Sequence, residues 1–115
     1  MEIRVFRNNA SIYLLKLSGA LDLSTSDKIK DLVMEIIKTR AEAFIINLAD
    51  VSSVDSSGVG ALLSVFSTLK KLGCPLVIIV PEGPVTQALE ATRLKGYFTI
   101  ACSLKEALSL TGRSA

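Results

Sequence analysis

The sequence contains no histidine and no tryptophan, and only two of its 115 residues are cysteine. Without histidine, the usual general base beside a serine or cysteine nucleophile is missing. Cys74 and Cys102 do not form a Cys-x-x-Cys pair, and no histidine is present to complete a zinc site. We therefore predict a protein that is not an enzyme and that carries neither a cofactor nor a metal ion.

Neither sign of charge is in large excess, because 13 basic residues stand against 11 acidic ones and the net charge is +2. Nucleic-acid-binding domains usually carry a clustered basic face. The local pair Lys70-Lys71 is expected at a solvated helix end. We therefore predict no direct contact with nucleic acid.

Long apolar runs are also missing. The longest clean aliphatic run covers residues 76–80, which is far too short to cross a bilayer. Residues 1–5 lack the apolar segment of a signal peptide. We expect a cytoplasmic protein without membrane insertion, and in that reducing compartment Cys74 and Cys102 are predicted to be buried or half-buried free thiols.

Aliphatic side chains dominate what is present, since half of the residues are apolar but only 5% are aromatic. The length fits one ordinary domain with a real hydrophobic core. We predict a single domain over residues 1–115, in which about 111–115 form a short flexible tail.

The first part of the chain has the pattern of a β-hairpin. Residues 2–7 and 11–18 are predicted to be antiparallel strands joined around Asn8-Asn9, because asparagine tolerates the left-handed conformation that tight turns require. Gly19 is expected to end the second strand.

Two later segments have the pattern of central strands. Residues 43–48 and 76–80 are nearly unbroken apolar runs, which are typical of strands covered on both faces. Residues 97–101 predict a short last strand.

Helical periodicity appears first from about residue 24 to residue 39, where apolar residues recur three and four positions apart. Ser24 or Ser26 is expected to cap this helix, and Asp27 adds negative charge to its first turn. A second amphipathic helix is closed by Gly73. A third begins at Pro84, and a last one begins at the capping-box sequence of residues 103–106.

The resulting order β-β-α-β-α-β-α-β-α predicts the fold class. It implies a single α/β domain with a mixed sheet, an N-terminal antiparallel hairpin, right-handed crossovers and about four helices. The predicted core includes large aliphatic side chains from both strands and helices: Ile45, Leu48, Val77, Ile79, Leu32 and Leu63.

The most informative segment is Asp50-Val51-Ser52-Ser53-Val54-Asp55-Ser56-Ser57-Gly58-Val59-Gly60. We expect residues 50–55 to form a loop and the residues after them to form the opening turns of the second helix. A helix start offers free N–H groups and the positive end of the helix dipole, and both favour a phosphate on a serine there. The alternative is that Asp55 or Ser56 only caps the helix. Asp50 and Asp55 are expected at opposite ends of this loop, and not as a catalytic pair.

Two glycines close this segment. Glycine inside a helix costs roughly 1 kcal/mol relative to alanine. Gly58 and Gly60, so near each other in the opening turns, therefore suggest that another surface approaches the backbone. The alternative, tight packing of the helix on its own sheet, stays open.

The same segment resembles the signature of STAS domains, specifically of bacterial anti-sigma factor antagonists. The likeness continues through Gly19-Ala20-Leu21-Asp22 after the second strand and Ile45-Ile46-Asn47-Leu48 in the central strand. Toward the C-terminus it includes Leu94-Lys95-Gly96-Tyr97-Phe98 and Ser103-Leu104-Lys105-Glu106-Ala107-Leu108. The resemblance covers essentially the whole chain.

The resemblance implies a regulator that switches partners when it is phosphorylated. The first serine of the family's Asp-Ser-Ser-Gly motif, here Ser56, is the phosphorylated residue. The kinase uses ATP and is itself the anti-sigma factor. The unphosphorylated antagonist binds the kinase and frees a sigma factor, and a metal-dependent serine phosphatase reactivates the phosphorylated form.

The resemblance also implies a binding face. Its residues are Asp22, Asp55, Ser57, Gly58 and Gly60, although Asp22 is equally well explained as a cap before Ser24. Ala20 departs from the family pattern, in which many relatives carry an acidic residue, so the partner can differ.

Other functions of the same fold remain open. A STAS scaffold subunit of a stress-sensing or lipid-transport complex is one, and a nucleotide-sensing or ligand-sensing module is another. Weak formation of a homodimer is left open as well.

Overall fold

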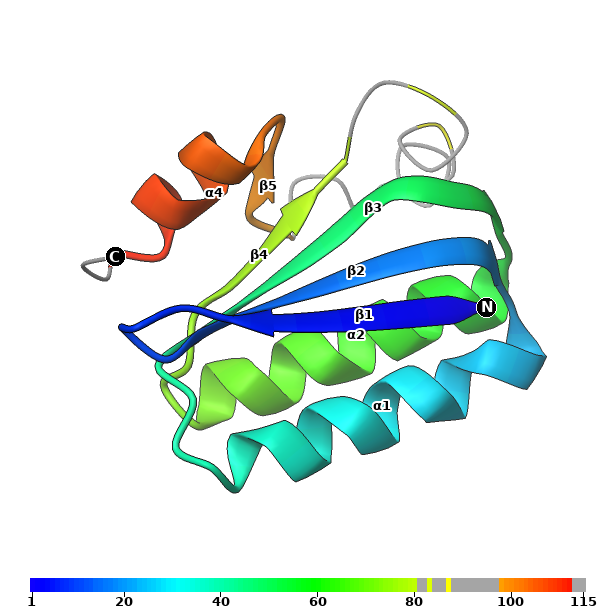
Figure 1. Ribbon diagram of the computed structural model, residues 1–115. Coiled ribbons are helices and arrows are strands. Elements are labelled where there is room, and N and C mark those ends of the chain that lie inside the picture. Colours follow the sequence, from blue (N-terminus) through cyan, green and yellow to red (C-terminus); the bar gives the residue numbers. More distant parts are fainter. Residues whose placement is uncertain (81–82, 84–86, 88–97, 113–115) are drawn as a thin grey trace.

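The computed structural model describes residues 1–80, 83, 87 and 98–112, and within them it shows a five-stranded sheet with the strand order β1-β2-β3-β4-β5 (Figure 1). Only β1 and β2 are antiparallel; the remaining neighbours are parallel. The predicted α/β class with an N-terminal hairpin is therefore confirmed. The strands are β1 (Glu2–Arg7), β2 (Ile12–Leu21), β3 (Ala43–Val54), β4 (Leu76–Ile79) and β5 (Ile100–Ala101).

The described residues hold three helices, α1 (Leu23–Ile37), α2 (Ser56–Lys71) and α4 (Leu104–Leu110). Helices α1 and α2 lie side by side across one face of the sheet, and α4 lies on the other face (Figure 1). The helix predicted to begin at Pro84 falls outside the described residues. Lys70 and Lys71 lie in the last turn of α2 and are exposed, as predicted.

Alternate residues of β3 serve two hydrophobic clusters. Phe44 and Ile46 face the cluster beneath α1 and α2, whereas Ala43 and Ile45 face the cluster beneath α4. This division explains why the run of residues 43–48 is almost entirely apolar. Of the predicted core residues, four are buried and two are only partly buried; the buried ones are Ile45, Leu48, Val77 and Ile79, and the others are Leu32 and Leu63.

The hairpin forms where it was predicted, but different residues stabilise its turn. The Asn8 side-chain oxygen accepts hydrogen bonds from the backbone N–H groups of Ala10 (2.9 Å) and Ile12 (3.0 Å). Ser11, and not an asparagine, adopts the left-handed conformation, with φ of 59°. The expectation that asparagine supplies this conformation is wrong, because its side chain is used to hold the turn.

Strand β2 does not end at Gly19 but continues to Leu21. Its partner β3 likewise continues to Val54, so most of the predicted loop is strand. Between the pairs Lys16–Asn47 and Leu21–Val54 there are two register shifts, at each of which β3 carries one extra residue. These shifts are β-bulges, and each places two consecutive residues of β3 on the solvent side.

The start of α1 differs only in part from the prediction. Asp22 is the N-cap residue, which confirms its alternative explanation as a cap and corrects the expectation that Ser24 or Ser26 caps this helix. Because the helix begins at Leu23, Asp27 lies beyond the first turn, which contains no acidic residue.

The C-terminal part of the sheet is shorter than predicted. Only Ile100 and Ala101 of the expected strand form β5. Thr111, expected in a flexible tail, is the buried C-cap of α4, and its hydroxyl donates to the Leu108 carbonyl oxygen at 2.7 Å. Residues 113–115 lie outside the described part.

The two cysteines have different environments. Cys74 is buried, as predicted, and its thiol lies 3.7 Å from the Ala41 carbonyl oxygen, whereas Cys102 is exposed, which corrects the prediction. Within residues 1–80 and 98–112, no helix is long and apolar enough to cross a membrane.

Candidate functional site

Asp55 connects β3 directly to α2. It is the N-cap of α2 with an extended backbone, and its carboxylate accepts a hydrogen bond from the Gly58 N–H at 2.9 Å. Its own N–H donates to the Leu21 carbonyl oxygen at 3.1 Å, which ties the cap to the end of β2. The capping role predicted for Asp55 is confirmed, and Ser56 is left free of that role.

Ser56 is the first residue of α2 and is exposed. Gly60 and Ser64 follow at intervals of four residues, so the three lie on one side of the helix, and each is exposed. Adding a Cβ to Gly60 would meet nothing within 4 Å. This side of α2, which we call the small-residue face, is defined by Ser56, Gly60 and Ser64.

Gly58 has a different explanation. It is buried, and a Cβ at this position would lie 2.4 Å from the Leu21 carbonyl oxygen and 2.8 Å from the Val54 side chain. The expectation that an outside surface accounts for both glycines is therefore wrong for Gly58, because tight packing of α2 on its own sheet excludes a side chain there. Ser57 is half-buried beside it.

Asp22 caps α1 at the neighbouring strand end. Its carboxylate accepts hydrogen bonds from the Ser24 hydroxyl (2.7 Å) and the Ser24 N–H (3.0 Å). Its own N–H donates to the Thr25 hydroxyl at 2.9 Å, which completes a capping box. The bond from the Ser24 side chain is the main cause that lowers the pKa of Asp22 below 3.8.

Ser26 joins the two helix starts, a role that no sequence pattern suggested. It is buried, and its hydroxyl donates to the Asp22 carbonyl oxygen at 2.7 Å with the Ser57 carbonyl oxygen also in reach at 3.1 Å. The contact links residues 31 positions apart in sequence. It therefore holds the start of α1 against the start of α2.

Leu23 is a second residue that the sequence did not single out. It is the first residue of α1, and 76% of it is exposed despite its apolar side chain. Figure 1 shows that α1 and α2 begin at the same end of the molecule, where the Ser26 hydroxyl joins the two helix starts. Leu23 and Ser56 are the first residues of these two helices. The exposure of Leu23 could not be predicted from the sequence, because Leu21 and Leu23 alternate like two core-facing residues of a strand.

The acidic residues of the segment are not brought together. Asp50 lies within β3, where its carboxylate is 3.9 Å from the Lys16 ammonium, whereas Asp55 caps α2. Among the described residues, no group of three or more potential metal ligands is found. The arrangement offers a charged and hydroxyl-bearing surface and not a carboxylate pair.

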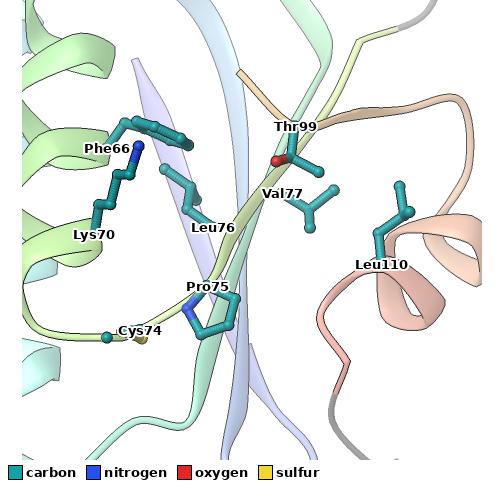
Figure 2. Close-up of a pocket in the computed structure, with 9 residues that line it drawn as sticks. Phe66, Lys70, Cys74, Pro75, Leu76, Val77, Thr99 and Leu110 are labelled. Carbon is teal, nitrogen blue, oxygen red and sulfur yellow. The ribbon is translucent and has the colours of Figure 1, made fainter. Parts of the chain in front are cut away.

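A separate hollow lies at the other end of α2. It has a volume of about 470 Å³ and is lined by residues of α2, β4 and α4 and by neighbouring residues. Figure 2 shows Phe66 and Lys70 of α2 on one side of β4 and Leu110 of α4 on the other. Since Lys70 is almost four turns from Ser56, this hollow is not part of the site described above.

A family model, a curated relative and solved structures match this chain. The family model "STAS domain" matches residues 4–107. A curated relative, the anti-sigma F factor antagonist of Paenibacillus polymyxa, is 28% identical over 94 residues, which cover 81% of this chain and 78% of the relative.

Two solved structures illustrate the shared fold. An anti-sigma factor antagonist from Mycobacterium paratuberculosis has a TM-score of 0.81 at 20% identity, covering 96% of this chain and 93% of that one. The Bacillus cell-fate determinant SpoIIAA in its phosphorylated form has a TM-score of 0.71 at 21% identity, covering 95% and 98%. Because the family model spans nearly the whole chain, the resemblance seen around Asp55-Ser56-Ser57-Gly58 is confirmed, and this chain belongs to the STAS domain family.

Proposed function

We propose that this chain is an anti-sigma factor antagonist whose partner choice is switched by phosphorylation of Ser56. The observation that carries the proposal is the position of Ser56. It is the exposed first residue of α2, and it directly follows Asp55, which already caps the helix. The names of the relatives support the same function.

In the proposed cycle, the unphosphorylated chain binds a serine kinase that is also an anti-sigma factor, and the sigma factor is released. The kinase then transfers the γ-phosphoryl group of ATP to the Ser56 oxygen. A P–O bond forms to Ser56, the bond to ADP breaks, and the hydroxyl proton passes to a base on the kinase. A serine phosphatase hydrolyses the phosphate ester and restores the hydroxyl.

A phosphate on Ser56 is expected to be less unfavourable in the free chain than in an interface with a partner. Phosphoserine carries about −1.5 to −2 charges at neutral pH. The first turn of α2 contains no acidic residue, and its N–H groups and dipole favour an anion. Asp55 lies next to the phosphate and opposes it, but its carboxylate is held by the Gly58 N–H.

The proposed contact surface consists of the small-residue face of α2 together with Asp22 and Leu23 at the start of α1. Gly60 lets a partner approach the helix backbone closely, because no side chain intervenes. Leu23, the exposed first residue of α1, provides apolar area. A phosphate placed in such an interface leaves charge buried without a partner, which costs about 2–5 kcal/mol and suffices to reverse partner choice.

The test compares Ser56→Ala, Ser56→Asp and the matched control Ser109→Asp as baits in cell extract of the source organism. We expect wild type, Ser56→Ala and Ser109→Asp to capture the same kinase, and Ser56→Asp to capture less of it. Ser109 is exposed on α4, so its replacement adds the same charge outside the proposed contact surface. After incubation with ATP and the captured kinase, mass spectrometry should find one phosphate on Ser56. Phosphate on Ser57, Ser52 or Ser53 with Ser56 unmodified would contradict the proposal.

The other two functions of the fold give different results in the same assay. A scaffold subunit would remain in a large stable complex whether or not Ser56 is replaced. A nucleotide or ligand sensor would show saturable binding without any protein partner.

A further inference from the structure

The outer edge of β1 is open. Strand β1 ends the sheet order, and Figure 1 shows no other described strand beside its outer side. Five of its six residues are exposed, among them the large apolar side chains of Val5 (43%) and Phe6 (50%). An exposed edge that carries apolar side chains is a template for pairing with another strand.

The hydrogen bonds of the hairpin show which backbone groups of this edge are available. The Asn8 N–H donates to the Ile12 carbonyl oxygen at 3.1 Å. In an antiparallel pair, residues that exchange hydrogen bonds alternate with residues that do not. Phe6 and Arg4 therefore bond to β2, and the N–H and C=O groups of the odd-numbered residues point to the free edge; these are Ile3, Val5 and Arg7.

The sequence of this edge fits a second copy of itself. When two β1 strands run antiparallel about a two-fold axis through Val5, Val5 faces Val5, Ile3 faces Arg7, and Arg4 faces Phe6. No like charges stand opposite each other, and three pairs each exchange two backbone hydrogen bonds. The positive charge of Arg4 is also neutralised within its own strand, because its guanidinium lies 2.9 Å from the Glu2 carboxylate.

Neighbouring registers are less favourable. A two-fold axis at Arg4 would place one Arg4 directly opposite the other, which is repulsive. An axis at Phe6 would leave Ile3 without a partner and remove one of the hydrogen-bonded pairs. The axis at Val5 also places the Arg4 guanidinium opposite the Phe6 ring, a favourable pairing of a cation with an aromatic face.

We propose that this chain forms a symmetric homodimer through its β1 edges, with Val5 on the two-fold axis, so that two five-stranded sheets become one continuous sheet. The interface consists of one strand from each copy, and a single added strand buries less surface than stable interfaces do. We therefore expect a concentration-dependent dimer with a dissociation constant between roughly 10 µM and 1 mM. The Ser56 surface takes no part in it.

Sedimentation velocity over this concentration range measures the association of the full chain. Val5→Lys places two like charges across the axis and should weaken the dimer at least about tenfold. Leu72→Lys is the matched control, because Leu72 is an exposed apolar residue at the end of α2 and is not part of the β1 edge. It should leave the dimer unchanged.

A mixing experiment tests the register. Val5→Lys and Val5→Glu should each associate at least about tenfold more weakly than the wild type when alone, whereas an equimolar mixture should associate more tightly than either variant because opposite charges then meet on the axis. Failure of the mixture to associate more tightly would contradict the axis at Val5.

Amide hydrogen exchange provides an independent readout. With rising concentration, exchange should slow at the amides of Ile3, Val5 and Arg7, while Arg4 and Phe6, already bonded to β2, should change little. A wild-type chain that stays monomeric at 1 mM, or a dimer that Val5→Lys leaves intact, would overturn the proposal.

Discussion

The Ser26 hydroxyl, on α1, lies 3.1 Å from the Ser57 carbonyl oxygen, on α2. It also donates to the Asp22 carbonyl oxygen at 2.7 Å, so one buried side chain joins the N-cap residue of α1 to the first turn of α2. These helices carry Leu23 and Ser56 at their first residues, and the Ser26 contact therefore fixes how the two halves of the proposed binding surface lie relative to each other.

Ser26→Ala should lower the free energy of unfolding by about 1 kcal/mol, because a buried hydrogen bond is lost and two carbonyl oxygens lose a donor. Ser64→Ala, a change of the same chemistry at an exposed position of α2, should have almost no effect. Urea unfolding curves measure both. Equal effects of the two changes would show that the Ser26 hydroxyl does not join the helices in solution.

The two glycines of α2 should respond in opposite ways to alanine. Gly58→Ala should destabilise the fold by about 1–3 kcal/mol, because the new Cβ would lie 2.4 Å from the Leu21 carbonyl oxygen, a backbone atom that cannot easily move. Gly60→Ala has open space and should stabilise the helix by roughly 0.5–1 kcal/mol. Thermal unfolding separates the two variants. If Gly60 contacts the kinase, Gly60→Ala should also weaken binding despite its higher stability.

The lowered pKa of Asp22 predicts a pH dependence of stability. The folded state binds this proton less tightly than the unfolded state, so the contribution is present at neutral pH and is lost as pH falls through the lowered pKa, below 3.8. The advantage of the wild type over Asp22→Asn should therefore be largest near neutral pH and shrink in acid. Urea unfolding of both proteins at a series of pH values checks this, and an advantage that grows in acid would contradict the assignment.

Ile79→Ala should lower the free energy of unfolding by about 2–5 kcal/mol, because Ile79 is a buried residue of β4 and the change leaves a cavity. Leu104→Ala, at a partly exposed position of α4 on the same side of the sheet, should cost clearly less. Denaturant unfolding gives both values. A cost near zero for Ile79→Ala would mean that β4 is not packed as described.

Much of the fold could be predicted because its signals are local. The runs of residues 43–48 and 76–80 are apolar on both faces, and the structure covers them on both faces. The loop predicted after Leu48 was wrong because Leu48, Val51 and Val54 are three residues apart. That spacing fits neither a regular strand nor a helix, and only the two bulges of β3 reconcile it with a strand.

The candidate site was predictable only in part. Asp55 and Ser56 follow from capping chemistry and from the family motif, since both depend on neighbouring residues. The contact between Ser26 and Ser57 joins distant parts of the chain, and no pattern in the sequence reports such a distance. The prediction for Gly58 was wrong for the same reason, because the Leu21 carbonyl oxygen that excludes a side chain belongs to β2, which is distant in sequence.

The bulges of β3 also determine which changes of length the protein can tolerate. Deleting Ala49 or Ser52 removes one extra residue and restores simple alternation, so that Leu48, Val51 and Val54 still face the core and Asp55 stays beside Leu21. Deleting Ile46, where no bulge exists, would instead turn Asn47 toward the core and Leu48 away from it, even if the next bulge absorbed the missing residue. Single-residue deletions at Ala49 or Ser52 should therefore yield folded protein that still melts cooperatively, while deletion of Ile46 should not.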